Sequence, residues 1–251
     1  MKNILVLYLV CAISTSALTC ACKKSGSSAT NTTSTVVPDV YKKIYGASDM
    51  YVSGEYIIIK STSLPDHKSP YYQGTQWSDK YEAYNGTNAN FMLNPNRIAQ
   101  SALTFKIPMN PAVAAIHSAT PMGAIGISIN GVPFFNQYAA GGAPLTGEIN
   151  SFDQYYGHPQ QQGQYHYHAE PYFLTTTKGK DALLGFLLDG FPVYGPIENG
   201  QLIGNAQLDT YHGHTTATAD YPNGIYHYHI TSTDPYLNGN GFYGTPGTVS
   251  N

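Results

Sequence analysis

Four of the nine histidines in the chain stand in two copies of one tetrapeptide, Tyr-His-Tyr-His, at residues 165–168 and 226–229. On a β-strand successive side chains point to opposite faces, so the histidines of each copy share one face and the tyrosines the other. Imidazoles two positions apart, with Cβ atoms roughly 6.5–7 Å apart, can converge on one metal ion. Each copy therefore predicts a two-ligand chelate.

A turn that contains an aspartate and ends in Gly-His precedes each tetrapeptide and could complete a metal site. The loop from this turn to the strand is short enough for the third histidine to fold back over the chelate, and the aspartate could bind the ion or orient a histidine. Imidazoles without thiolates suit Zn²⁺ or Cu²⁺, with Fe²⁺ and Ni²⁺ as further options. The candidate ligands are His158, His166, His168, His214, His227, His229, Asp153 and Asp209.

Two other interpretations of these histidines stay open. The Tyr/His strands could be packing elements whose imidazole N–H groups are satisfied by Asp153 or Asp209. The same histidines and aspartates could also perform acid–base catalysis without a metal. His212 has no counterpart in the first copy, where Tyr156 stands, and lone His117 favours a structural role.

The two tetrapeptides end two copies of a longer repeat, at about residues 123–175 and 182–236. The first copy consists of IGISINGVPFFN, FDQYYGH and YHYH, and the second of LGFLLDGFPVYG, LDTYHGH and YHYH. The three blocks keep their order, which indicates an internal duplication. Because both copies retain the aspartate and Gly-His, we expect one site per repeat rather than one site pooled from both tetrapeptides.

The local patterns predict an all-β fold. Each repeat begins with an apolar run that ends in Asn-Gly or Asp-Gly, the strongest short-range signal for a hairpin. Runs at 56–62 and 102–108 also predict strands, and residues 40–251 sustain no helical period beyond a couple of turns. With 25 glycines, 22 tyrosines and 16 prolines, the chain predicts a single turn-rich domain of short strands built on the duplication, over residues 40–251. We expect the two tetrapeptide strands to lie near one another in it.

The start of the chain reads as an export signal. Residues 1–22 have a basic start, an apolar run and a small residue before Cys22, a pattern typical of a bacterial lipoprotein signal peptide. We expect lipidation at Cys22, with Cys20 as the alternative, and a flexible Ser/Thr-rich tether over residues 23–39. The protein would then be exported and anchored by lipid in the bacterial cell envelope.

Cysteine content and charge exclude two classes of site. All three cysteines lie in this leader, so the folded domain has neither disulfides nor thiolate ligands. The formal net charge is −3 and no basic patch is evident, so we expect no nucleic-acid partner.

Several motifs together resemble the YHYH domain family, over about residues 50–240. They are PDHKSPYY (65–72), GISINGVPFFN (126–136), DGFPVYGP (189–196) and the Gly-His turns followed by YHYH. The resemblance implies an exported bacterial protein, often with a lipoprotein leader, and no particular reaction. It adds His67 as a further metal ligand or a structural hydrogen-bonding residue. Members often carry a cysteine in the turn before Gly-His, where this chain has Tyr155 and Tyr211, so a thiolate or disulfide there is excluded.

These observations favour a lipid-anchored, metal-binding YHYH-domain protein. One alternative is a metal-dependent hydrolase, in which the histidines leave a coordination position open for water. The other is a metal-free module with structural histidines that binds glycans or surfaces, with Tyr236 and Tyr243 as candidate contacts. The sequence leaves open whether the protein is an enzyme and which protein or glycan is its partner.

Overall fold

The computed structural model describes residues 36–251, which belong to one compact unit. The predicted signal peptide, Cys20, Cys22 and most of the predicted tether lie outside the described residues. Within the described range no helix combines the length and the apolar character needed to cross a membrane.

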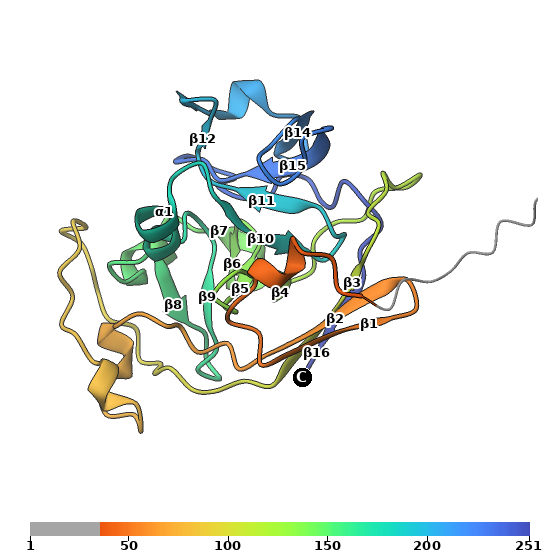
Figure 1. Ribbon diagram of the computed structural model, residues 1–251. Helices are drawn as coiled ribbons and strands as arrows, with labels where there is room; N and C mark the ends of the chain where they lie inside the picture. Colours follow the sequence, from red (N-terminus) through yellow and green to blue (C-terminus); the bar gives the residue numbers. More distant parts are fainter. Residues whose placement is uncertain (1–35) are drawn as a thin grey trace, which may run out of the picture. The chain divides into compact units, whose positions relative to one another are not determined.

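The fold is mostly β, as the sequence predicts, and its main element is an eight-stranded sheet (Figure 1). Its strand order is β14-β15-β11-β10-β4-β5-β9-β8. The first repeat supplies β4 (Ala124–Ser128), β5 (Pro133–Phe135), β8 (Gly157–Pro159) and β9 (Tyr165–Tyr167). The second repeat supplies β10 (Leu183–Leu187), β11 (Pro192–Tyr194), β14 (Gly213–Thr216) and β15 (Ile225–His229).

This order is a palindrome, so the two repeats are related by a pseudo-two-fold axis between β4 and β10. These two strands pair antiparallel at the centre of the sheet. In each repeat the hairpin strand pairs in parallel with the tetrapeptide strand, β5 with β9 and β11 with β15, and the Gly-His strand forms the edge. The internal duplication is therefore visible in the topology as well as in the sequence.

The two tetrapeptide strands lie in one sheet but are not neighbours. Four strands separate β9 from β15. At about 4.8 Å per strand, they are about 24 Å apart, too far to share a metal ion. The expectation that they lie near one another is therefore wrong. Each tetrapeptide strand pairs with a hairpin strand of its own repeat, and its tyrosines are buried within that repeat.

Two equivalent glycines, Gly126 and Gly185, allow β4 and β10 to lie close together at the pseudo-two-fold axis. A Cβ on Gly126 would lie 2.4 Å from the carbonyl oxygen of Phe186, and one on Gly185 would lie 2.2 Å from that of Ile127. Any larger residue would push β4 and β10 apart. Both strands are buried along their whole length, with Ile127 and Phe186 fully inaccessible, so this junction is the centre of the core.

The remaining elements surround this sheet. The predicted strands at 56–62 and 102–108 are confirmed as β2 (Tyr56–Ser61) and β3 (Leu103–Pro108). With β1 (Asp49–Ser53) and β16 (Thr248–Ser250) they form a second sheet in the order β1-β2-β3-β16. Two short hairpins occupy equivalent places in the repeats, β6 (Tyr138–Ala139) with β7 (Ala143–Pro144), and β12 (Ile197–Glu198) with β13 (Gln201–Leu202).

Helical segments in the described range are short. The single α-helix is α1 (Tyr172–Lys178), and it follows the first tetrapeptide. The 3₁₀ turns are η1 (Tyr41–Lys43), η2 (Pro70–Tyr72), η3 (Ser78–Lys80), η4 (Ala140–Gly142), η5 (Glu148–Ser151) and η6 (Asn205–Gln207).

Candidate metal centres

Three histidines and one glutamate converge at each end of the eight-stranded sheet. Cluster 1 consists of Glu148, His158, His166 and His168, and cluster 2 of Glu198, His214, His227 and His229. In each cluster one ligand atom from every member lies within 4.8 Å of all the others. The structure thus brings together the predicted histidines of each repeat separately.

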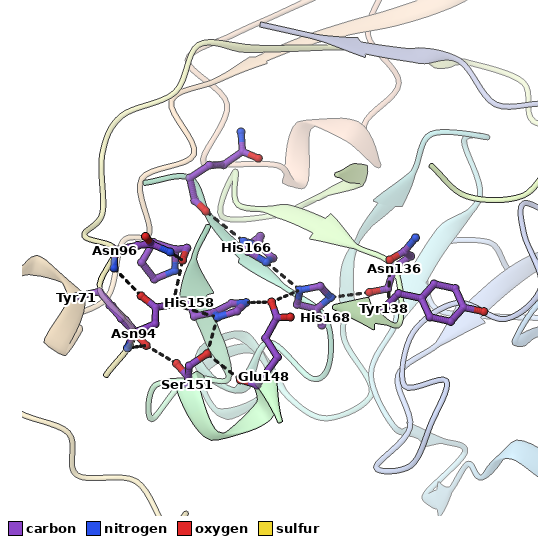
Figure 2. Close-up of polar contacts among 12 residues, drawn as sticks. Tyr71, Asn94, Asn96, Asn136, Tyr138, Glu148, Ser151, His158, His166 and His168 are labelled. Carbon is purple, nitrogen blue, oxygen red and sulfur yellow. Dashed lines mark hydrogen bonds and ion pairs between the residues drawn. The ribbon is translucent and has the colours of Figure 1, made fainter. Parts of the chain in front are cut away.

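The polar atoms of cluster 1 have the spacing of a metal coordination shell. His166 Nε2 lies 2.9 Å from His168 Nε2, and Glu148 Oε1 lies 3.2 Å from His158 Nε2 and 3.8 Å from His168 Nε2. Ligands about 2.05 Å from a tetrahedral ion are about 3.4 Å from one another. Figure 2 shows the three imidazoles and the carboxylate turned toward one another.

Backbone carbonyls fix the protonation of two of these imidazoles. His166 Nδ1 donates to the carbonyl oxygen of Gln164 at 3.1 Å, and His168 Nδ1 donates to that of Asn136 at 2.6 Å (Figure 2). A carbonyl only accepts, so in the neutral rings the proton is on Nδ1 and Nε2 carries a bare lone pair. Two bare Nε2 atoms 2.9 Å apart repel each other unless a cation lies between them.

His158, the third histidine of cluster 1, also donates its Nδ1–H, but to a serine hydroxyl instead of a backbone carbonyl. Ser151 Oγ donates its one proton to the carbonyl oxygen of Glu148 at 2.7 Å, so it accepts from His158 Nδ1, also at 2.7 Å. His158 Nε2 is then unprotonated, and it is a buried atom without a hydrogen bond, although Glu148 is close. A metal ion in cluster 1 would satisfy this orphaned nitrogen.

Cluster 2 repeats this geometry. His227 Nδ1 donates to the carbonyl oxygen of Ile225 at 3.0 Å, and His229 Nδ1 donates to that of Gly195 at 2.7 Å. The Nε2 atom of His229 lies 3.1 Å from that of His227 and 3.2 Å from that of His214. The Glu198 carboxylate oxygens lie 3.3 Å from His214 Nε2 and 3.4 Å from His227 Nε2. The lone pairs therefore converge in both repeats.

The tyrosines of the tetrapeptide point to the opposite face and hold the turns in place. Tyr165 donates to both Asp153 oxygens at 2.8 and 2.9 Å, and Tyr226 donates to Asp209 at 2.9 Å. Asp153 Oδ1 also accepts the backbone N–H of Tyr155, and Asp209 Oδ1 accepts that of Tyr211, each at 2.9 Å. These bonds close the Gly-His turn and so position the third histidine.

Asp153 and Asp209 therefore lie outside both clusters, and within the described residues neither forms a hydrogen bond with a histidine. Asp153 is fully buried, and this burial raises the pKa of its carboxyl despite the hydrogen bonds from Ser69 and Tyr165. The carboxylates that lie within reach of the histidines are those of Glu148 and Glu198.

The second tyrosine of each tetrapeptide reaches the hairpin turn of its own repeat. The Tyr167 hydroxyl accepts from Asn130 Nδ2 at 3.2 Å, and the Tyr228 hydroxyl donates to Asp189 Oδ2 at 2.6 Å. Asn130 and Asp189 are the Asn-Gly and Asp-Gly residues of the two hairpins. The tetrapeptide thus presents histidines to the cluster on one face and ties two turns together on the other.

A glycine precedes each third histidine because a tyrosine ring lies directly above it. A Cβ on Gly157 would lie 2.5 Å from the ring of Tyr165, and one on Gly213 would lie 2.5 Å from the ring of Tyr226. No other residue fits without displacing the ring that holds the aspartate.

The remaining histidines lie away from the clusters. His67 is on the tyrosine face, where its Nε2 contacts the Tyr167 hydroxyl at 3.2 Å and its Nδ1 donates to the Lys68 carbonyl oxygen at 2.9 Å. His67 therefore has the position of a structural hydrogen-bonding residue. His212 Nε2 contacts Thr231 Oγ1, and His117 Nδ1 donates to the Phe242 carbonyl oxygen.

A family model described as "YHYH protein" matches residues 104–201 and 197–241. The chain belongs to the YHYH protein family. The match contains all eight cluster residues, but it begins after residues 65–72, so the motif around His67 lies outside it. No curated protein and no solved structure matches the chain.

Glu148 and Glu198 are not among the candidate ligands that the sequence predicts. One signal was available: each is the only glutamate between the hairpin and the Gly-His turn of its repeat. They do not occupy equivalent positions, however. Glu198 lies in β12, where the first repeat has Ala139 in β6, whereas Glu148 begins η5, five residues before Asp153. When the two repeats are aligned, Glu148 and Glu198 therefore fall at different positions.

Each cluster faces a surface cleft. The cleft beside cluster 1 has a volume of about 490 Å³ and is lined by Phe135 and Tyr138 as well as by cluster residues. The cleft beside cluster 2 has a volume of about 440 Å³ and is lined by Tyr194 and Thr218. The histidines of cluster 1 are at most 3% exposed, while the Glu148 side chain is 25% exposed. An ion would therefore reach cluster 1 past the carboxylate.

Burial favours the neutral form of the four tetrapeptide imidazoles. It lowers the pKa of His168 to about 4, with a further contribution from nearby His158, and it lowers that of His229 to about 4. Burial also raises the pKa of Glu148, but the neighbouring His158 and His168 together outweigh burial and hold this pKa below its ordinary value. At neutral pH the tetrapeptide imidazoles are thus uncharged and lie beside a carboxylate, which is the protonation state that metal binding requires of them.

These shifts predict that the metal-free protein loses stability in mild acid. Six described histidines have a lowered pKa in the folded state, three of them to about 4: His67, His166, His168, His212, His227 and His229. The unfolded chain binds protons near pH 6.5, so the folded state binds fewer protons between pH 6.5 and 4, and stability falls across this window. Asp153 and Asp189, whose pKa burial raises, act in the opposite direction but are only two groups.

We expect the free energy of unfolding to fall by at least about 3 kcal/mol between pH 7 and pH 4. Urea unfolding of chelator-treated protein at several pH values measures this directly. A profile that is flat, or that rises toward pH 4, would show that the histidines are not buried in neutral form.

Proposed function

We propose that the protein binds two divalent transition-metal ions, one in each repeat. In each cluster three imidazole Nε2 atoms and one carboxylate would form the ligand set. The ions would be Zn²⁺ or Cu²⁺, the metals that imidazole and carboxylate ligands without thiolates suit best.

The observation that carries this proposal is the convergence of unprotonated nitrogens. At least two imidazoles in each cluster donate Nδ1–H to a backbone carbonyl, so their Nε2 lone pairs face one another at about 3 Å. Structural histidines would instead share protons between neighbours, because a buried lone pair without a donor is costly. Metal-ligating histidines typically donate the other ring N–H to a carbonyl or carboxylate, as these do.

The origin of the two glutamates supports the same conclusion. The repeats share their hairpins, Gly-His turns and tetrapeptides, but the carboxylate comes from η5 in one and from β12 in the other. A carboxylate at the same place from different elements indicates that the cluster itself needs an anion. An anion beside converging imidazole lone pairs favours a cation between them.

The clefts favour one second candidate, metal-dependent hydrolysis. Glu148 and Glu198 lie on the cleft side of their clusters, so water could take the coordination position of a displaced carboxylate. A metal-loaded protein that hydrolyses a simple ester, and loses this activity on metal removal, would support the hydrolase. A four-ligand shell with the carboxylate bound favours metal binding without hydrolysis.

We also propose that the protein is exported and held at the cell envelope by a lipid on Cys22. The composition of residues 1–22 and the small residue before Cys22 support this. Labelling with a palmitate analogue tests it: a Cys22→Ser variant that loses the label would support Cys22, one that keeps the label would move the site to Cys20, and an original protein without label would refute the anchor.

Elemental analysis of the purified protein without a histidine tag tests the metal proposal. We expect two ions per chain after dialysis against a metal mixture, and none after treatment with a strong chelator. Protein that retains fewer than about 0.2 ions per chain at neutral pH, and whose melting temperature a chelator does not change, would refute it.

A further inference from the structure

A third cleft, distinct from those beside the two clusters, has a volume of about 460 Å³. Its walls come from four parts of the chain, around residues 84–88, 149–156, 169–170 and 231–236. Both repeats contribute to it. We infer that this cleft binds a neutral carbohydrate.

Three tyrosines give the cleft its aromatic surface. The Tyr84 ring stacks on Phe91 with centroids 3.8 Å apart and an interplanar angle of 5°, so its orientation is fixed. Tyr156 is 36% exposed, and Tyr236 is partly buried. Flat, rigid aromatic faces stack against the C–H faces of sugar rings, which gives affinity without charge.

The backbone at two of these tyrosines is unusual. Among the described non-glycine residues only five have positive φ, and Tyr156 (63°) and Tyr236 (59°) are two of them. Such conformations are uncommon for bulky residues and gather at functional sites. His212, the counterpart of Tyr156, shares the turn with φ 75° but is only 2% exposed. The same turn therefore buries a side chain in one repeat and presents a tyrosine to the cleft in the other.

The polar groups of the cleft suit hydroxyl groups rather than ions. Asn88 Nδ2 donates to Asn150 Oδ1 at 3.2 Å, and the exposed side chains of Thr87 and Ser232 add two hydroxyls. The described lining contains one carboxylate, Glu170, and no lysine, arginine or histidine. A phosphate or a uronic acid would find no positive partner here, whereas a neutral sugar would find both donors and acceptors.

The cleft and cluster 1 have one wall in common but no shared ligand atoms. Phe152 lines the cleft, and its ring lies 4.8 Å from the ring of His158. A sugar would contact the outer side of this wall. Sugar binding is therefore expected to persist after metal removal. Its test does not depend on whether the proposed metal sites are correct.

Isothermal titration with neutral tetrasaccharides built from glucose, mannose, galactose or N-acetylglucosamine tests the inference. We expect at least one of them to bind the intact protein, and the Tyr156→Ala and Tyr236→Ala variants to bind it about fivefold more weakly or worse. Tyr138→Ala, in the cleft beside cluster 1, is the matched control and should bind like the original protein.

A Ser232→Trp variant covers the case in which a tyrosine variant fails to fold. Ser232 is exposed at the cleft, so a large side chain there should block the sugar without changing the core. Binding by chelator-treated protein that Ser232→Trp abolishes would support the inference. No binding of any of the four sugars, binding that all three cleft variants retain, or binding only of acidic oligosaccharides would overturn it.

Discussion

Replacing His166 and His168 together by alanine is expected to remove one of two bound metal ions and to leave the other in place. The clusters share no ligand, and four strands of the sheet separate their tetrapeptides. Elemental analysis of the double variant should therefore give one ion per chain. At a free metal concentration of about 1,000 times Kd, the lost ion also removes about 4 kcal/mol of stabilisation, which thermal unfolding would detect.

The matched variant is His227→Ala with His229→Ala, which should remove the other ion. His117→Ala should retain two ions, because His117 belongs to neither cluster, although it stacks on Tyr211 of the second Gly-His turn. Loss of both ions from either double variant would indicate a single pooled or cooperative site. Retention of both ions in each double variant would show that the tetrapeptides do not bind the metal.

The carboxylate of cluster 1 is expected to contribute strongly to the metal affinity of this cluster. Glu148→Ala should weaken metal binding at this cluster by about 100-fold or more, because it removes the only anionic member. Adding Ala139→Glu to this variant should restore much of the affinity. Ala139 in β6 is the counterpart of Glu198 in β12, and both strands belong to equivalent two-stranded hairpins.

Metal titration of the remaining cluster separates the outcomes. It is best done in the background of the His227→Ala and His229→Ala variant, where only cluster 1 can bind. Unchanged affinity in Glu148→Ala would show that the carboxylate is not a ligand. A folded double variant without any recovery would show that the two hairpins place their side chains differently. Glu148→Gln, which keeps the shape but not the charge, tells whether the anion itself is needed.

The chemistry of the tetrapeptide could be predicted from its sequence because a strand alternates. Adjacent residues of β9 and β15 had to face opposite ways, and the structure places the histidines of each on the cluster and the tyrosines away from it. The strands, the hairpins and the duplication followed from equally local signals, which is why the all-β fold and the family assignment are confirmed.

The carboxylates of the two clusters could not be predicted in the same way. An aspartate that closes a turn and an aspartate that binds a metal look alike in sequence, and Asp153 and Asp209 were the nearer candidates. Their oxygens are instead occupied by tyrosine hydroxyls and turn N–H groups. Glu148 and Glu198 reach the clusters only through tertiary folding, from elements that the repeats do not share.

The distance between the two tetrapeptides could not be predicted from local sequence patterns either. Each tetrapeptide strand needed a partner for its ladder, and the sequence did not show which strand that would be. The structure pairs β9 with β5 and β15 with β11, so the hairpins occupy the centre of the sheet and the tetrapeptides lie toward its two ends.

Anomalous diffraction from crystals of the metal-loaded protein, recorded above the absorption edge of the bound metal, would locate the bound ions. We expect two anomalous peaks per chain, each at about 2.0–2.1 Å from three Nε2 atoms and close to Glu148 or Glu198. Peaks at Nδ1 atoms, a single peak away from both clusters, or metal-saturated crystals without a peak at either cluster would contradict this expectation.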